Sequence, residues 1–322
     1  MKRRDFLKYS VALGMSNIFS PFQRGEAQPL RKVRFSSTTV GLVALTMNVL
    51  SDKKFDRKHG IESEIIRAGA QREVQQLTLF KKVDSSVYNL TATVAASEVG
   101  ATLQGYAPFT WAHVSLVSKP NLKFEKPQDI IGKKIGAFSR ATSFSHFEMA
   151  FKKYGVDLSK QCKLIFAAPG ALFGYLEKGD IDVAHTFEPH TSKFIGSGKY
   201  KEIFNLNEQW KKMTGISKTI AFFAGYSDWI DSNIELVRAT KAAIIETNEH
   251  ISKTPDVIDE YKGIFGLEKK EELEAAKKRI PPLYTARWDA EVERSLAADM
   301  KELFEDGFID GIPKGPVVRV QI

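Results

Sequence analysis

The chain has 322 residues, a formal net charge of +8 and a single cysteine, Cys162. The positive charge is spread along the chain without long runs of lysine or arginine, which argues against nucleic-acid binding and gives a weak preference for anionic ligands. One cysteine excludes an intramolecular disulfide, and no segment after the N-terminal region has the uninterrupted apolar length of a membrane span.

Residues 1–27 have the pattern of an export signal. A basic start is followed by an apolar stretch at residues 9–19 that is too short to cross a bilayer, and the small residues Gly25 and Ala27 predict cleavage near Ala27. The pair Arg3 and Arg4 resembles a twin-arginine signal, with an ordinary secretory signal as the alternative. We therefore expect a periplasmic protein and leave residues 1–27 out of the fold.

Strand-like and helix-like segments alternate from residue 33 onward. Residues 33–37 and 61–66 are predicted strands, and Gly60 is predicted to stop a helix in the left-handed conformation. Residues 73–82 are a predicted helix whose Val74, Leu77 and Phe80 side chains turn inward. This β-α-β-α order predicts a mainly parallel sheet with helices on both of its faces.

Helices dominate the last third of the chain, from about Ser232. Ser232 and Glu235 have the spacing of a capping box at a helix start. Apolar residues then recur on one helical face in two segments, which we expect to pack on a lobe rather than to build a new site. The residues are Val237, Ile244 and Ile251 in the first segment and Val292, Leu296, Met300 and Leu303 in the second.

Three stretches carry a family resemblance by their order and spacing: residues 55–65, 127–136 and 176–189. Together they resemble the periplasmic solute-binding proteins of ABC transporters in the nitrate/sulfonate/taurine and thiamine-precursor group, the NMT1/THI5-like family. The last stretch ends in Phe187, Glu188 and Pro189, with Phe in place of the Trp that is usual in that family.

The resemblance implies an α/β chain with a type II periplasmic-binding-protein fold, in which two lobes joined by two crossover strands close over a ligand. We expect residues 28–118 and 222–322 in lobe 1 and residues 119–221 in lobe 2. The implied function is that of a monomeric receptor that captures a small organic ligand for an inner-membrane ABC permease. No cofactor, bound metal, nucleic-acid partner or enzymatic activity is expected.

Ligands of open α/β sheets bind beyond the carboxyl ends of the strands, and this rule selects several loops. Ser37 and Thr38 follow the first strand, and Asn89 and Thr91 follow a strand that ends near residue 87. Each of these side chains has a competing role as a helix cap. The most specific loop offers hydroxyls, a guanidinium group and a helix start, which all favour an anion. Its residues are Ser139, Arg140, Thr142 and Ser143.

Aromatic residues near the same strand ends predict a ligand with an apolar or planar body. Trp111 lies beside the predicted first crossover, and Phe138 and Phe187 flank the other loops. Glu188 has two open roles: it binds an amino or ring N–H group of the ligand, or it orients the backbone of its turn.

Three alternatives fit parts of the sequence. His146, His185 and His190 allow a metal site, although their spacing fits neither a helical face nor a strand face. An enzyme similar to the pyrimidine-precursor synthases of thiamine biosynthesis shares the expected fold, but those enzymes carry a cysteine-rich motif that this chain lacks. A periplasmic sensor or adaptor protein that binds the same ligand fits the sequence as well.

Overall fold

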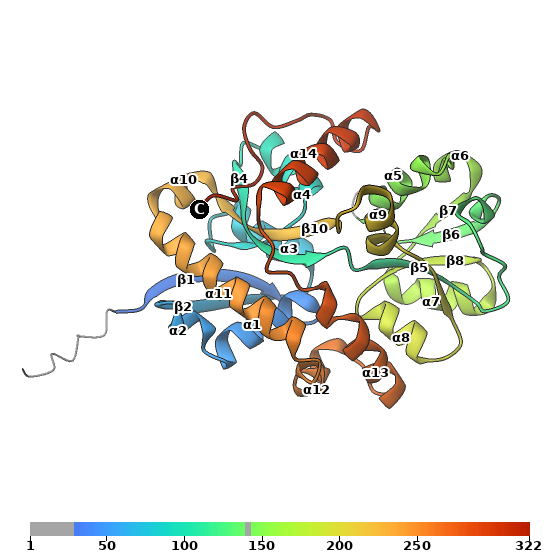
Figure 1. Ribbon diagram of the computed structural model, residues 1–322, viewed down its shortest axis with the longest axis horizontal. Helices are drawn as coiled ribbons and strands as arrows, with labels where there is room; N and C mark the ends of the chain where they lie inside the picture. Colours follow the sequence, from blue (N-terminus) through green and yellow to red (C-terminus); the bar gives the residue numbers. More distant parts are fainter. Residues whose placement is uncertain (1–28, 139–142) are drawn as a thin grey trace, which may run out of the picture.

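The computed structural model describes residues 29–138 and 143–322 (Figure 1). In this part of the chain the strands form a parallel pair, β1–β2, a three-stranded sheet, β3–β10–β4, and a five-stranded sheet, β7–β6–β8–β5–β9. Helices pack around the strands of both lobes, which confirms the predicted α/β fold with two lobes. The predicted signal region and the residues Ser139, Arg140 and Thr142 lie outside the described residues.

The first lobe is built around β1 (Arg31–Thr38), which pairs in parallel with β2 (Ile61–Ala68). A bridge between Phe35 and Ser85 brings β1 beside β3 (Ser86–Tyr88). β10 (Thr219–Tyr226) is antiparallel to both β3 and β4 (Leu103–Trp111). The helices of this part are α1 (Leu42–Asp52), α2 (Phe55–Lys58), α3 (Gln71–Leu79), α4 (Leu90–Glu98), α10 (Ser227–Ser232) and α11 (Ile234–Lys253).

The second lobe is built around the five-stranded sheet. Its strands are β5 (Val114–Ser118), β6 (Lys134–Ala137), β7 (Lys163–Phe166), β8 (Val183–Phe187) and β9 (Lys201–Asn205). β6 is parallel to β7 and β8, whereas β5 is antiparallel to β8 and β9. Its helices are α5 (Ser145–Lys153), α6 (Leu158–Gln161), α7 (Pro169–Lys178), α8 (His190–Gly196) and α9 (Leu206–Thr214).

The chain passes twice between the three-stranded and the five-stranded sheet. The first passage lies between β4 and β5, and the second lies between α9 and β10. The predicted boundary after residue 118 coincides with the end of β5, which is hydrogen-bonded within the five-stranded sheet. The lobe ranges 28–118 with 222–322, and 119–221, stay a proposal.

The early predicted strands and the turn at Gly60 are confirmed, whereas the mainly parallel sheet that was expected is mixed, because β10 and β5 are antiparallel to their neighbours. The predicted strands lie within β1 and β2, and Gly60 between α2 and β2 has a φ of 74°. Val74 is buried as expected, but Phe80 is 70% exposed, so its prediction as an inward-facing residue is wrong. The reason is that α3 ends at Leu79, and Phe80 is its C-cap residue, outside the regular helix.

Each lobe contains the same aspartate brace between two of its strands. In the first lobe Asp84 Oδ2 accepts a hydrogen bond of 2.8 Å from the backbone N–H of Arg34, and the Asp84 N–H donates to Arg34 O. In the second lobe Asp182 Oδ2 accepts one of 2.8 Å from the N–H of Lys134, and the Asp182 N–H donates to Lys134 O. The sequence separations are 50 and 48 residues. The two lobes therefore share the same hydrogen-bond pattern at equivalent positions.

The C-terminal helices α12 (Val257–Glu260), α13 (Lys270–Arg279) and α14 (Ala290–Glu305) lie along both lobes (Figure 1). α13 packs against α8 of the second lobe, and α14 contacts both β10 and α5. The apolar faces predicted in this region are buried, but α11 begins after Asn233, whose side chain makes no capping hydrogen bond. The Ser232–Glu235 capping box is therefore wrong, because Ser232 already belongs to α10.

A fully buried ion pair connects α14 to the residue before β10, at the second passage between the sheets. Lys218 directly precedes β10, and its Nζ atom lies 2.5 Å from Asp299 Oδ1 of α14. The same Nζ lies 3.7 Å from the centroid of the Trp210 ring. Burial lowers the pKa of Lys218 and raises the pKa of Asp299, so each charge depends on the other for its stability.

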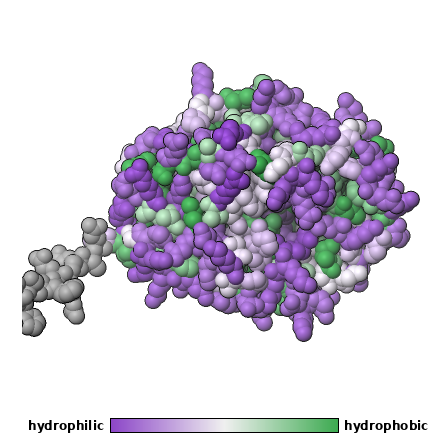
Figure 2. All heavy atoms as spheres, in the orientation of Figure 1, coloured by the Kyte–Doolittle hydropathy of each residue, from purple (hydrophilic) through white to green (hydrophobic). Residues whose placement is uncertain are grey.

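The face of the molecule seen in Figure 2 is mostly hydrophilic, with small scattered apolar patches. Within the described residues, no helix combines the length and the apolar character that crossing a membrane requires.

Candidate functional site

The strand ends that were expected to bind ligand gather where the chain passes between the sheets. Trp111, the last residue of β4, pairs with Thr219 at the start of β10, and Phe187, the last residue of β8, pairs with Val114 at the start of β5. Since β3 is antiparallel to β10 and β1 lies parallel to β3, the carboxyl ends of β1 and β3 point to the same side. β6 runs parallel to β8. The strand ends that precede the four candidate loops therefore all face the junction of the lobes.

The hydroxyls after β1 hold the turn into α1. Ser37 is fully buried, and its Oγ donates a hydrogen bond of 2.9 Å to Thr38 O. Thr38 Oγ1 donates one of 2.7 Å to Val40 O. Val40, by contrast, is exposed at this edge. These contacts support the turn-forming role of both hydroxyls, and their role in ligand binding stays a prediction.

Asn89 has the geometry of a helix cap. Its Oδ1 atom accepts hydrogen bonds from the backbone N–H of Ala92, at 2.8 Å, and from Thr91 Oγ1, at 2.9 Å. This matches the capping role that was the alternative to ligand binding. Trp111 is half-buried at the end of β4, beside the first passage between the sheets.

Ser143 is the one described residue of the predicted anion loop, and it is held by a buried histidine. Ser143 Oγ lies 3.0 Å from His185 Nε2, and the His185 ring packs edge-on against Phe144 and Phe147. Burial lowers the pKa of His185 to about 3, so the imidazole is neutral at physiological pH. His185 therefore fixes the start of α5 as a hydrogen-bonding group and contributes no positive charge.

Phe187 forms part of an aromatic cluster at the ends of two neighbouring strands. Its ring lies edge-to-face with Phe138, with ring centroids 6.0 Å apart, and with His190, at 5.0 Å. Phe138 directly follows β6 and is 42% exposed. The structure thus brings Phe138, Phe187 and His190 together, and the exposed Phe138 ring offers an apolar surface beside the predicted anion loop.

Glu188 is buried, and both of its carboxylate oxygens have partners within the protein. Oε1 lies 2.6 Å from Arg279 Nε, and Oε2 accepts hydrogen bonds from the Ser192 N–H and Oγ at 3.0 and 2.6 Å. Burial raises the pKa of Glu188, and the Arg279 charge opposes this shift. These partners favour the second of the two predicted roles, in which Glu188 orients its turn. No local sequence pattern predicts the contact with Arg279, because Arg279 lies 91 residues further along the chain.

The histidines provide no support for a metal site. His146 and His185 are both buried, and their Nδ1 atoms make no hydrogen bond. Within residues 29–138 and 143–322, no group of three or more His, Cys, Asp or Glu side chains is placed to hold a metal ion.

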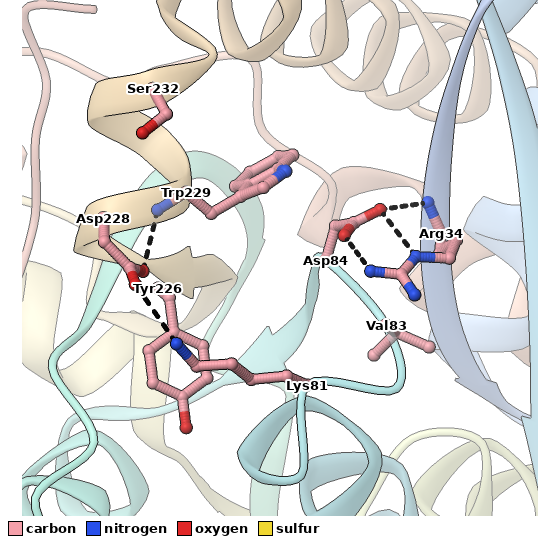
Figure 3. Close-up of a pocket in the computed structure, with 8 residues that line it drawn as sticks. All are labelled: Arg34, Lys81, Val83, Asp84, Tyr226, Asp228, Trp229 and Ser232. Atoms are coloured by element: carbon pink, nitrogen blue, oxygen red, sulfur yellow. Dashed lines mark hydrogen bonds and ion pairs between the residues drawn. The ribbon is translucent and has the colours of Figure 1, made fainter.

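A separate pocket lies on the first lobe, away from the predicted loops (Figure 3). The Arg34–Asp84 ion pair forms one wall, and Lys81, which pairs with Asp228 at 3.1 Å and lies over the Tyr226 ring, forms another. Because these charges are already paired, and Arg34 and Asp84 serve the brace between strands, we assign the pocket a structural origin.

A family profile and several known proteins match the chain. The profile of the family described as NMT1/THI5 like matches residues 48–258. The taurine-binding periplasmic protein of Escherichia coli is 24% identical over 201 residues, which cover 62% of this chain and 58% of that protein. The match thus spans less than two thirds of that relative's length.

Solved structures share the fold at low sequence identity. The periplasmic aliphatic sulphonate binding protein SsuA from Escherichia coli superposes with a TM-score of 0.73 at 14% identity, covering 89% of this chain and 95% of that one. The periplasmic nitrate-binding protein NrtA from Synechocystis PCC 6803 has a TM-score of 0.60 at 12% identity, covering 87% and 82%. At these identities the likeness establishes the fold and leaves the ligand open.

Proposed function

The chain belongs to the NMT1/THI5-like family, and from this premise we propose that it is the periplasmic substrate-binding component of an ABC importer. In this proposal the two lobes close over a small organic ligand, and the permease recognises the closed form. The observation that carries the proposal is the convergence of the carboxyl ends of β1, β3, β6 and β8 on the junction between the lobes. The relatives named above are binding proteins, and we propose no enzymatic activity.

An organic anion with an apolar or aromatic body is the ligand class that we propose. Glu188 shares the guanidinium group of Arg279 with Glu202, and His185 is uncharged, so the positive charge that would attract an anion has to come from the loop after β6. The sequence of the loop after β6 supplies Arg140 and hydroxyls next to a helix start, which favour a sulfonate or carboxylate group. The exposed ring of Phe138 beside Phe187 suits an apolar or aromatic body.

The proposed ligand-binding residues are those expected from the sequence, with Phe138 added. We give Ser143, Phe138, Phe187 and the Arg140 loop the direct contacts, and Glu188 and Asn89 mainly a supporting role, because their side chains are engaged within the protein. The full set is Ser37, Thr38, Asn89, Thr91, Trp111, Phe138, Ser139, Arg140, Thr142, Ser143, Phe187 and Glu188.

Ligand binding is expected to stabilise the protein in a thermal melt. A ligand that binds only the folded state adds about 2.7 kcal/mol when it is present at 100 times its dissociation constant. Purified protein from residue 28 onward is melted with taurine, longer alkanesulfonates, nitrate, aromatic carboxylates and pyrimidines. If none of them raises the melting temperature and no small molecule co-purifies, the receptor function is contradicted.

Replacing Arg140 by alanine is expected to weaken binding of an anionic ligand roughly tenfold or more, because hydrogen bonds to charged groups contribute about 1.5–3 kcal/mol. The measurement is isothermal titration with the ligand identified by the melts. Arg294→Ala is the matched control, since Arg294 is an exposed arginine on α14. Equal affinities of the two variants would exclude Arg140 from the site and favour a neutral ligand.

A further inference from the structure

The segment that carries α13 is anchored in the first lobe at both of its ends. Before α13, Glu260 of α12 pairs with Lys53 at 2.6 Å. After α13, Tyr284 Oη donates a hydrogen bond of 2.8 Å to Leu42 O, and Tyr284 also forms a strand bridge with Thr110 of β4. The position of α13 is therefore set by the first lobe.

The same helix packs closely on the second lobe. α13 lies along α8 (Figure 1), and the two helices approach so closely at Gly196 that a Cβ atom there would lie 2.5 Å from Glu272 Cα and 2.7 Å from Glu271 O. Nearby, Lys193 Nζ of α8 lies 3.4 Å from Gly266 O, in the segment between α12 and α13. The contact between α8 and α13 thus involves backbone as well as side chains.

Arg279, the last residue of α13, reaches the turn after β8, beside the proposed ligand site, and the strand β9. Its Nε atom lies 2.6 Å from Glu188 Oε1, and its two terminal nitrogens lie 2.7 and 3.1 Å from the Glu202 carboxylate of β9. Glu202 in turn accepts a hydrogen bond of 2.5 Å from Ser115 Oγ of β5. One guanidinium group therefore connects the turn after β8 with Glu202 near the start of β9, and through Glu202 it is connected to β5.

These ion pairs are largely shielded from solvent, so the attraction between the charges is screened less than in an exposed pair, and separating them would leave the Glu188 charge buried without a partner. The Glu188 side chain is 2% exposed, and those of Arg279 and Glu202 are 21% and 22% exposed. Glu188 directly follows Phe187, whose ring is part of the aromatic cluster at the proposed site. Any movement of α13 away from the second lobe therefore has to separate Arg279 from the turn that carries Phe187.

We propose that Arg279 is a positioning residue that ties the first lobe to the ligand-binding edge of the second lobe. It fixes the turn at Phe187 and Glu188 and limits how far the lobes open, without touching the ligand. The effect on ligand affinity rests on the proposed function, whereas the effect on lobe opening does not require a ligand.

The test measures lobe separation and affinity in the same variants. Spin labels are placed at Glu98→Cys on α4 and Lys160→Cys on α6, both exposed and one in each lobe, in a Cys162→Ser background. The distance between them is measured by double electron–electron resonance without ligand, and the affinity for taurine is measured by calorimetry. The tested variants are Arg279→Ala, Arg279→Lys and the double variant Glu188→Gln/Arg279→Gln.

Lys277→Ala is the matched control. Lys277 lies on the same helix, and its ion pairs with Asp256 and Asp259, at 2.7 and 2.8 Å, stay within the C-terminal segment. Arg279→Ala is expected to add a longer component to the distance distribution and to weaken taurine binding by about 5- to 150-fold, the usual range for coupling between sites. Arg279→Lys is expected to show a smaller increase in the distances and a smaller loss of taurine affinity than Arg279→Ala. Lys277→Ala is expected to change neither the distances nor the affinity.

The double variant separates positioning from folding, because it removes the fully buried Glu188 charge together with Arg279, while Glu202 keeps the hydrogen bonds from Ser115 and Asn205. It is expected to stay folded and still to show the longer distances. If Arg279→Ala and the double variant lower only the melting temperature and leave the distances unchanged, Arg279 is merely structural and the proposal is wrong. If no variant and no wild-type protein binds taurine while the distances still lengthen, taurine is excluded as the ligand and the tie between the lobes stands.

Discussion

Replacing Asp299 by alanine is expected to lower the free energy of unfolding by about 3–5 kcal/mol, the usual cost of leaving a buried charge without its partner. Lys218 Nζ lies 2.5 Å from Asp299 Oδ1, and the two side chains are 0% and 3% exposed. Without Asp299, the buried ammonium group loses its ion-pair partner and keeps the Trp210 ring and the Coulombic attraction of Glu302 as favourable neighbours. Denaturant unfolding followed by circular dichroism measures the change.

Two further variants show whether the buried charge is the cause. Glu305→Ala on the same helix removes an exposed partner of Lys301 and is expected to change stability by less than about 1 kcal/mol. The double variant Lys218→Met/Asp299→Leu replaces both charges by apolar groups and is expected to recover most of the loss. A double variant as unstable as Asp299→Ala would show that packing, and not the unpaired charge, determines the loss.

Replacing Phe223 by alanine is expected to cost about 3–5 kcal/mol, the range for removing a large buried aromatic side chain from a core. Phe223 lies at the centre of β10 and is fully buried. Its ring lies edge-to-face with Phe35 of β1 and Phe109 of β4, at centroid distances of 6.3 and 5.7 Å. The substitution therefore opens a cavity between the three strands that carry the first-lobe side of the candidate site.

Phe80→Ala is the control for this prediction, because Phe80 is a phenylalanine of the same lobe that is 70% exposed. It is expected to change stability by less than about 0.5 kcal/mol, as is usual for surface positions. Both variants are compared with the wild type by denaturant unfolding, with one common slope for the dependence of the unfolding free energy on denaturant concentration. A similar loss in both variants would contradict the buried position of Phe223.

The order of the elements could be predicted from the sequence because its signals are local. Alternating apolar residues fixed the position of β1, a glycine after a helix placed the turn at Gly60, and helical spacing placed α14. Helix ends were less predictable. Phe80 continues the apolar spacing of α3, yet the helix ends one residue earlier, and the spacing of Ser232 and Glu235 belongs to a junction between two helices.

The candidate site was predictable only as a set of loops. The rule for strand ends places side chains such as Ser143 and Phe187 at the junction of the lobes, but it does not say what each one contacts. Arg279 approaches Glu188 across 91 residues, and Lys218 pairs with Asp299 across the same lobe junction. No local pattern marks such pairs, because they depend on how α13 and α14 pack after the sheets have formed.

The aspartate braces make it possible to compare the two lobes position by position. The fourth residue after braced Arg34 is Thr38, and the fourth after braced Lys134 is Phe138. The fifth residue after Asp84 is Asn89, and the fifth after Asp182 is Phe187.

Equivalent strand ends thus carry a hydroxyl and an amide in the first lobe and two aromatic rings in the second. A ligand held between them is expected to meet these aromatic rings and the loop that carries Arg140 on the second lobe. The second lobe would therefore hold both the apolar body and the anionic group of the ligand, and closure would add the polar side of the first lobe.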